Sequence, residues 1–423
     1  MRTPLQTLPL ISLVALVALA ALQGAVMPAR ASSESTIFVN TTDDELVNDG
    51  DCSLREAIYA ANTDSNLYGC VQGSGNDTIF LPQGVYTLTR DSVDEEDFAV
   101  SGDLDIREDL TLLGADRDSS VIDGNSIDRV FHIIGIDMVV KISHLTIQNG
   151  SAPITATNQF GGGGILNQNE VGTLILDEVS VLNNQSDGVG GGITNEYILE
   201  LNDSIVSDNH GVAGGGIYNG GTLTIRGSTL YLNTALETGG GLDDSGNVTL
   251  ENVTISGNTA ERGGGIFSDG EVNILHSSIL QNLATDTDYG GNIHSGNLFY
   301  FYNTLIANSQ SGPNCSGSGL NSLGYNLEGQ LAGQYTCSFN RNYTDPLVDP
   351  LLADNGGPTP TQALLLGSPA VDAGDERYCA DKDQRGAFRP ADGDGDEIAI
   401  CDIGAFEYEG VFSMFVFSPL ILR

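Results

Sequence analysis

Hydrophobic and polar residues alternate with a period of two through most of the chain, in short stretches that repeatedly break phase. In the segment VTLENVTISGN (residues 248–258), Val248 and Leu250 fall on one face. The phase breaks at Asn252, after which Val253 and Ile255 fall on that face again. Because the side chains of a strand alternate between its two faces, this pattern predicts short strands joined by bends.

Two columns of residues repeat with the same period in the middle of the chain. Glycine-rich triplets are followed, at intervals of 24 to 28 residues, by the apolar residues Ile165, Ile193, Ile217, Leu242, Ile266 and Ile293. An asparagine column recurs at intervals of 24 to 26 residues: Asn184, Asn209, Asn233, Asn258, Asn282 and Asn308. Helical-hairpin repeats need about 34 residues, and the spacing typical of leucine-rich repeats is absent. The pattern predicts an all-β chain folded as a right-handed parallel β-helix, with coils stacked about 4.8 Å apart.

Both columns have a structural explanation in such coils. An asparagine at a fixed turn can exchange amide hydrogen bonds with the asparagine one coil away, so the column predicts a structural ladder. Glycine permits positive φ and a close approach of successive backbones at the other corner. A phosphate-binding role for the glycine runs is disfavoured, because no strand–GxGxxG–helix unit surrounds them.

One helix is expected at the head of this all-β chain, within DCSLREAIYAANTDSN (residues 51–66). Ser53 and Glu56 have the spacing of a capping box, and apolar residues follow at helical spacing. The open end of a β-helix exposes strand edges and apolar core, so we expect this helix to cover it. A catalytic role for Arg55 and Glu56 is the alternative, and it is disfavoured because the cap already accounts for both residues.

Two hydrophobic stretches mark the ends of the chain. In residues 1–31, Arg2 precedes an apolar run, and ARA at 29–31 has the small-x-small form of a signal-peptide cleavage site. An uncleaved membrane anchor is the alternative, although the run is shorter than the roughly 20 residues of a spanning helix. The tail, residues 411–423, is also too short to span a bilayer and is expected to cap, sort or anchor the protein. Any membrane attachment would therefore use one of these two ends.

The predicted domain organisation follows from these features: a signal peptide (1–31), a cap with the first coils (32–135), β-helix repeats (136–310), C-terminal coils (311–410) and the tail (411–423). Neighbouring cysteines are predicted to form disulfides in the pairs Cys52 with Cys70, Cys315 with Cys337, and Cys379 with Cys401. An exported chain meets an oxidising compartment, and no pair has the CxxC spacing of a zinc site. Two of the separations approximate one coil, and residues one coil apart lie within reach of a disulfide.

Several motifs resemble known families of secreted proteins. CSLREAI (residues 52–58) is similar to the signature of the CSLREA domain, which is found near the start of secreted bacterial β-helix proteins. The asparagine and GGGI coils resemble those of polymorphic outer-membrane proteins, and NSLGYNLEG, DNGGPTPTQALLLGSPAVDAGD and CDIGAFEYE resemble the choice-of-anchor Q domain. The resemblance implies an exported protein, either displayed at the cell surface or outer membrane or released. It implies no settled activity and brings no catalytic residues.

A formal net charge of −40 argues against nucleic acid or anionic lipid as a partner. The stretch ADGDGDEIAICDIGAFE (residues 391–407) is the best candidate for a calcium loop. Its candidate metal ligands are Asp392, Asp394, Asp396, Glu397 and Asp402. The match to an EF-hand is partial, and a solvated acidic turn is the alternative. In DQRG, Arg385 is expected to pair with Asp383, Asp372 or Asp375.

Enzymatic function is one of two classes that stay open. Polysaccharide hydrolases and lyases share the β-helix, so Asp243 with Asp208 or Asp269 is a candidate carboxylate pair, and Arg226 or Arg262 a candidate lyase base. The polygalacturonase motifs are only partly present, since NHG at residues 209–211 replaces GHG and no RIK occurs. Fold alone is a weak argument for activity, so no catalytic residue is predicted.

A non-catalytic binding protein is the favoured class. The residue after each GGGI-type motif varies from coil to coil: Leu166, Thr194, Tyr218, Asp243, Phe267 and His294. Tyr218 and Phe267 are candidates for contact with a glycan or a protein, although single exposed aromatic residues are common. We predict an adhesive or binding protein outside the cell, with a polysaccharide or a surface protein as its ligand.

Overall fold

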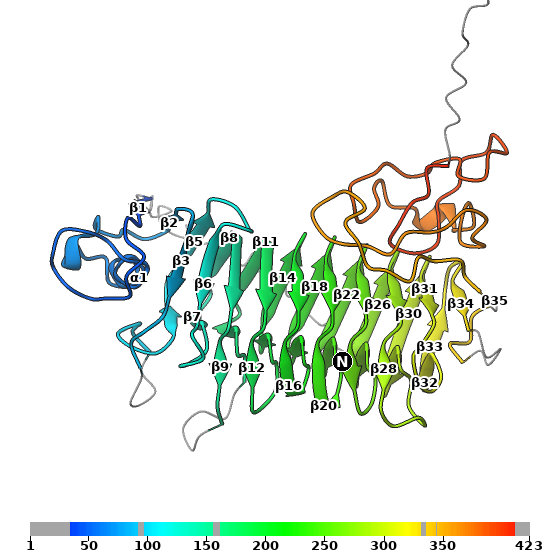
Figure 1. The fold of residues 1–423 in the computed structure, drawn as a ribbon, viewed down its shortest axis with the longest axis horizontal. Helices are drawn as coiled ribbons and strands as arrows, with labels where there is room; N and C mark the ends of the chain where they lie inside the picture. Colours follow the sequence, from blue (N-terminus) through cyan, green and yellow to red (C-terminus); the bar gives the residue numbers. More distant parts are fainter. Residues whose placement is uncertain (1–33, 92–96, 155–160, 331–335, 344, 411–423) are drawn as a thin grey trace, which may run out of the picture. The chain divides into compact units, whose positions relative to one another are not determined.

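The computed structural model describes residues 34–91, 97–154, 161–330, 336–343 and 345–410. All of them belong to one compact unit, Ser33–Arg423. The predicted signal peptide (1–31) and tail (411–423) lie outside the described residues. The chain folds as a right-handed parallel β-helix, as the sequence predicts, with coils stacked from β1 to β35 (Figure 1). Within the described ranges, no helix is long and apolar enough to cross a membrane.

The largest sheet, sheet A, has two columns of strands joined by a bend in each coil. The first column contains β1 (Thr36–Phe38), β2 (Asp77–Leu81), β5 (Leu110–Gly114), β8 (Val139–Gln148), β11 (Thr173–Leu182), β14 (Ile198–Asn202), β18 (Thr222–Arg226), β22 (Asn247–Glu251), β26 (Glu271–Leu275), β30 (Leu298–Tyr302) and β33 (Leu320–Ser322). The second column contains β3 (Gly84–Thr87), β6 (Ser120–Asp123), β15 (Ile205–Ser207), β19 (Thr229–Tyr231), β23 (Thr254–Ser256), β27 (Ser278–Leu280), β31 (Leu305–Ala307), β34 (Leu327–Gly329) and β35 (Arg341–Tyr343). The long strands β8 and β11 extend through both columns.

Two further parallel sheets complete each coil. Sheet B contains β4 (Leu104–Ile106), β7 (Phe131–Ile136), β10 (Ile165–Glu170), β13 (Ile193–Asn195), β17 (Ile217–Asn219), β21 (Leu242–Asp244), β25 (Ile266–Ser268), β29 (Ile293–Ser295) and β32 (Cys315–Gly317). Sheet C contains β9 (Ser151–Ala152), β12 (Gln185–Ser186), β16 (His210–Ala213), β20 (Thr234–Thr238), β24 (Thr259–Ala260) and β28 (Leu283–Ala284). A complete coil therefore runs from sheet B through both columns of sheet A to sheet C.

The apolar residues after the glycine triplets stack in register along the inside of sheet B. Ile165 pairs with Ile193, which pairs with Ile217, and the column continues through Leu242 and Ile266. All five side chains are fully buried in the core. Burial of each aliphatic side chain contributes about 1.5–3 kcal/mol, so the repeated column supplies much of the force that holds successive coils together.

Helix α1 (Leu54–Thr63) covers the N-terminal end of the coils, as predicted. The Ser53 hydroxyl accepts from the backbone N of Glu56, and the Glu56 carboxylate accepts from the backbone N of Ser53, which completes the capping box. Arg55 is buried, pairs with Asp44 and donates to the carbonyl oxygens of Ala99, Asp103 and Gly102. Both candidate residues therefore have structural partners. The 3-10 turn η1 (Leu67–Gly69) follows the helix.

The asparagine ladder is present, but its last predicted member is wrong. Side-chain amide bonds of 2.9–3.1 Å join Asn184, Asn209, Asn233, Asn258 and Asn282 in order. The ladder then continues through Asn292 and Asn314 instead of Asn308. Pairing of Leu280 with Ala307 places Asn308 opposite Gln281, at the bend one residue before the ladder position, with φ of 54°. The interval of 26 residues from Asn282 to Asn308 is therefore one residue shorter than the spacing between equivalent positions in these two coils.

Residues 345–410, here called the C-terminal segment, do not continue the coils as expected. Apart from isolated bridges and the 3-10 turn η2 (Glu376–Tyr378), the segment has no regular structure in its described residues. It folds back along the second column of sheet A (Figure 1). Thr229 donates to the carbonyl of Pro360, Thr254 donates to Gln384, and Ser278 accepts from the backbone of Ala405.

The contact between this segment and the coils is partly apolar. A second hydrophobic cluster joins sheet A residues to residues of the segment: Leu280, Leu305, Ala307, Leu327, Val348, Leu364, Ala370, Ala373, Ile403 and Phe406. The cysteines pair as Cys52–Cys70, Cys315–Cys337 and Cys379–Cys401, with Cα–Cα distances of 4.9, 5.0 and 6.0 Å. The third disulfide does not join adjacent coils as expected, because both of its residues lie in the C-terminal segment.

Candidate functional site

The best candidate site lies on the outward face of sheet B. Parallel register places Tyr218, Asp243, Phe267 and His294 on successive strands, and we call these four residues the sheet B column. Two earlier residues at this position, Leu166 and Thr194, were expected to be exposed but are buried. The open part of this face therefore begins at Tyr218.

Aromatic side chains gather at the later end of the sheet B column. The rings of Phe267 and His294 stack with centroids 5.1 Å apart, and Tyr289 meets His294 edge-on at 4.9 Å. The Arg262 guanidinium lies 5.5 Å from the ring centroids of both Phe267 and Tyr289. All four side chains are half-buried, so the cluster is held in place while its outer edges stay open to a ligand.

Asp243 is the unusual member of the column. Its side chain is 6% exposed, and Oδ2 is buried without a hydrogen-bond partner among the described residues. Burial raises the pKa of Asp243 to about 6, with further upward contributions from the charges of Asp244 and Asp269. The Thr238 hydroxyl and the charge of Arg262 act in the opposite direction. Near pH 6 this carboxyl can therefore either donate or accept a hydrogen bond.

The neighbouring imidazole is held neutral. Burial is the largest cause of the lowered pKa of His294, and the charge of Arg262 lowers it further. The Nδ1 atom of His294 lies 2.7 Å from the hydroxyl of Ser316. The site therefore combines a neutral imidazole, a guanidinium and a carboxyl group that is protonated in part, all beside aromatic surface.

The structure brings together only some of the proposed catalytic partners. Asp269 is close enough to Asp243 to affect its pKa. Asp208 is exposed at the bend after β15 of sheet A and is not among the groups that shift the pKa of Asp243. Arg262 borders the site, whereas Arg226 lies on β18 of sheet A and pairs there with a glutamate. The pairing of Asp243 with Asp208 is therefore excluded, and so is Arg226 as a base beside Asp243.

Sequence reasoning missed a second polar ladder inside sheet B. Asn167, Asn195 and Asn219 donate in turn to the next member at 2.7 Å, and Asn219 donates to Asp244. Ser268 then donates to the other oxygen of Asp244 at 2.7 Å. The signal was the polar residue two positions after each GGGI-type motif. Because this ladder fixes Asp244, it also fixes the strand that carries Asp243.

The predicted calcium ligands are dispersed. Asp372, Asp392 and Asp394 each offer an oxygen within 4.8 Å of the others. Asp396 and Glu397 do not join this group, and Asp402 is fully buried, where it accepts from the backbone N of Asp372 and Tyr408. Burial and the facing Glu407 raise the pKa of Asp402, so this residue belongs to the interior of the segment. Calcium binding stays a prediction.

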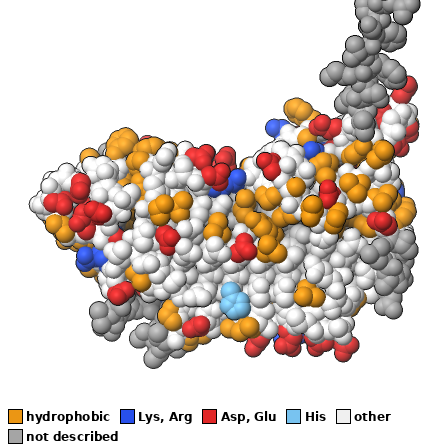
Figure 2. Space-filling model, in the orientation of Figure 1, with side chains coloured by type: hydrophobic (Ala, Val, Ile, Leu, Met, Phe, Trp, Pro, Cys, Tyr) orange, Lys and Arg blue, Asp and Glu red, His pale blue; other side chains and the backbone are white. Residues whose placement is uncertain are grey.

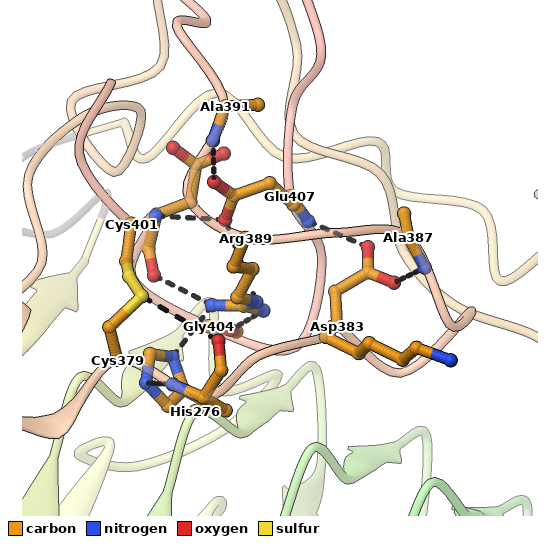
Figure 3. Close-up of polar contacts among 12 residues, drawn as sticks. His276, Cys379, Asp383, Ala387, Arg389, Ala391, Cys401, Gly404 and Glu407 are labelled. Atoms are coloured by element: carbon orange, nitrogen blue, oxygen red, sulfur yellow. Dashed lines mark hydrogen bonds and ion pairs between the residues drawn. A yellow bond between two sulfur atoms is a disulfide. The ribbon is translucent and has the colours of Figure 1, made fainter. Parts of the chain in front are cut away.

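A buried polar network joins the C-terminal segment to the coils (Figure 3). Arg389 donates to the carbonyls of Asp402 and Gly404 and lies 3.6 Å from Glu407, while its Nη1 donates to Nδ1 of His276 at 2.6 Å. Burial, followed by the charge of Arg389, lowers the pKa of His276 to about 3, so this imidazole is neutral. The network is structural, because none of these side chains is exposed.

Arg385 pairs with Asp383, which is one of the three partners expected for the arginine of DQRG. The Arg385 guanidinium lies 2.7 Å from Asp383, which also accepts from the backbone of Ala387 and Glu407 (Figure 3). The guanidinium carbon of Arg385 lies 3.6 Å from the centre of the Phe406 ring. These contacts support the structural role that the sequence predicted.

An apolar groove follows the junction between sheet A and the C-terminal segment. Figure 2 shows hydrophobic side chains gathered where the segment meets the coils, together with many more acidic than basic side chains. A groove of about 380 Å³ at this junction is lined in part by Leu232, Gln281, Leu351 and Leu352. It contains no titratable cluster comparable to the sheet B column, so the column is the better candidate for recognition chemistry.

Comparison with known proteins assigns no family to the chain. No protein-family model matches the chain, and no curated protein matches it. Among solved structures, the crystal structure of pectate lyase Pel9A aligns with a TM-score of 0.47 and 13% identity, covering 89% of this chain and 97% of that chain. A likeness at this level carries no inference about activity. The coils and their pairing define the class of protein, a right-handed parallel β-helix with three disulfides.

Proposed function

We propose that this chain is an exported carbohydrate-binding β-helix whose ligand lies across the sheet B column. The observation that carries the proposal is the half-buried aromatic cluster of Phe267, Tyr289 and His294, with the Arg262 guanidinium beside it. The aromatic edges offer apolar contact for the C–H groups of a sugar ring.

Charge narrows the ligand to neutral glycans. Among the groups named at the site, Arg262 is the one cation, and Asp243 interacts with the negative charges of Asp244 and Asp269 as well as with Arg262. The whole chain carries a formal charge of −40, which repels polyanions. Export is supported by the three disulfides, which persist in oxidising compartments.

Affinity electrophoresis through gels that contain neutral or acidic polysaccharides tests the proposal. We expect at least one neutral polymer to retard the protein and Phe267→Ala to weaken that binding about 10-fold, equivalent to about 1.4 kcal/mol. Phe388→Ala is the matched control, because Phe388 is 77% exposed on the C-terminal segment. No retardation by any polymer, or an equal loss in both variants, would contradict the proposal.

Hydrolysis is a second candidate function, favoured by the raised pKa of Asp243. An inverting glycosidase pairs a protonated general acid with a second carboxylate. Asp269 is the nearby carboxylate that could fill the second role. Release of reducing ends from a bound polymer, abolished by Asp243→Asn, would identify a hydrolase. Binding without release would support the non-catalytic function.

A further inference from the structure

A histidine and two aspartates converge at the N-terminal end of sheet B. Asp105 on β4 pairs in register with His132 on β7, so the two side chains point outward as neighbours. Asp97 reaches the same place from the chain that precedes β4. The Nδ1 atom of His132 lies 3.3 Å from Oδ1 of Asp105 and 3.8 Å from Oδ1 of Asp97.

The orientation of the imidazole is set from its other side. The Nε2 atom of His132 lies 3.0 Å from the amide oxygen of Gln168 on β10. An amide oxygen only accepts hydrogen bonds, so Nε2 carries the hydrogen and Nδ1 faces the two carboxylates. Histidines that bind metals almost always donate their second ring N–H to such an acceptor.

The two distances from the imidazole nitrogen to the carboxylates match a small dication. A tetrahedral ion with ligands at about 2.1 Å separates neighbouring ligand atoms by about 3.4 Å. The distances from His132 to the two carboxylates, 3.3 and 3.8 Å, lie close to that value. Calcium prefers six to eight oxygen ligands, whereas an imidazole with carboxylates suits zinc and related transition metals.

We propose that Asp97, Asp105 and His132 bind a transition-metal dication of the zinc type. Asp105 and His132 are 0% and 4% exposed and form the floor of the site. The Asp97 side chain is 45% exposed, which leaves the fourth position on the solvent side for a water molecule. This site goes beyond the proposed glycan binding and shares no residue with the sheet B column.

Neighbouring side chains hold in place the segment that carries Asp97. Arg107 donates to the backbone carbonyl of Asp97 and lies 4.5 Å from the ring of Phe98. Arg55 of the cap helix donates to the carbonyls of Ala99 and Gly102 in the same segment. The bound ion would add a further link between this segment and the first coils, and would raise the thermal stability of the protein.

Titration of the purified, metal-stripped protein with zinc chloride in a calorimeter tests the site, with cobalt(II) absorption as a second readout. We expect one tight equivalent of zinc, a tetrahedral cobalt spectrum and a rise in Tm. Asp97→Asn and Gln168→Leu should each weaken zinc binding about 10- to 100-fold, and His132→Gln should abolish the tight equivalent. The tight equivalent should be unchanged in Phe267→Ala, which separates this site from the glycan site.

Two controls keep the result specific. His210→Gln removes an exposed imidazole on β16, and Asp392→Asn disrupts the separate acidic group of the C-terminal segment. Neither should change the tight equivalent. If His132→Gln does not fold, Asp97→Asn and Gln168→Leu decide the question, because their side chains are not fully buried. Absence of a tight equivalent in the wild type, or an unchanged zinc affinity in these two variants, would show that His132 and the aspartates form only an ion pair.

Discussion

Replacing Asn258 by alanine should destabilise the coils by an amount that follows from its hydrogen bonds. The side chain is fully buried and donates to the carbonyl of Leu230 at 3.0 Å and to Asn282 at 2.9 Å. Its oxygen accepts from the backbone N and the side-chain amide of Asn233 at 2.9 and 3.0 Å. Alanine removes one partner each from both Asn233 donors and from the Leu230 carbonyl, at about 1 kcal/mol per group, whereas the Asn282 oxygen keeps its bond from the backbone N of residue 258.

The free energy of unfolding should therefore fall by about 3 kcal/mol, which for a unit of this size corresponds to about 4 °C in Tm by scanning calorimetry. Asn308→Gly is the matched control, because this asparagine lies outside the ladder and its Oδ1 has no hydrogen-bond partner among the described residues. Its φ of 54° also suits glycine. We expect a change below about 1 kcal/mol there. Equal losses in the two variants would refute the energetic role of the ladder.

Three further predictions concern buried charge and the C-terminal segment. Between pH of about 4 and about 6, native Asp243 keeps a proton that the unfolded chain has lost, so stability falls as pH rises through this window. In Asp243→Asn, this pH-dependent fall in the free energy of unfolding should be smaller by up to about 3 kcal/mol. Unfolding of the wild type and the variant at pH 4 and pH 8 measures the difference. Arg389→Met leaves Glu407 buried without its cation and should cost about 3–5 kcal/mol in urea unfolding at pH 7. Replacing Cys379 and Cys401 by serine opens a link across 22 residues, worth about 3 kcal/mol, and should speed proteolysis of the segment while the coils stay resistant.

The sequence predicted the coils because each repeat contacts mainly its neighbours. Ile193 and Ile217 occupy equivalent places in adjacent coils, so their spacing records a direct contact. Capping by Ser53 and Glu56 is equally local and was predicted correctly. The error at Asn308 arose where a longer interval moved the ladder position by one residue, and a shift of one residue exchanges an inward side chain for an outward one.

The candidate site was only half visible in the sequence for a related reason. Spacing placed Tyr218, Asp243 and Phe267 in one column, but it gave no measure of burial. The unpartnered oxygen of Asp243 and the stacking of Arg262 on Phe267 depend on side chains from neighbouring coils and loops. Sequence periodicity therefore locates a face of the β-helix, whereas the chemistry of that face depends on how its side chains pack.

The C-terminal segment covers the second column of sheet A and leaves sheet B open to a ligand. Thr229, Thr254 and Ser278 point outward from sheet A, where polar residues are expected to meet water, yet all three are buried by the segment. The bond from Thr254 to Gln384 joins residues 130 positions apart, a separation that no repeat records. Because the segment occupies this part of sheet A, a long ligand would meet uncovered coils on sheet B. The half-exposed aromatic residues lie together on that face.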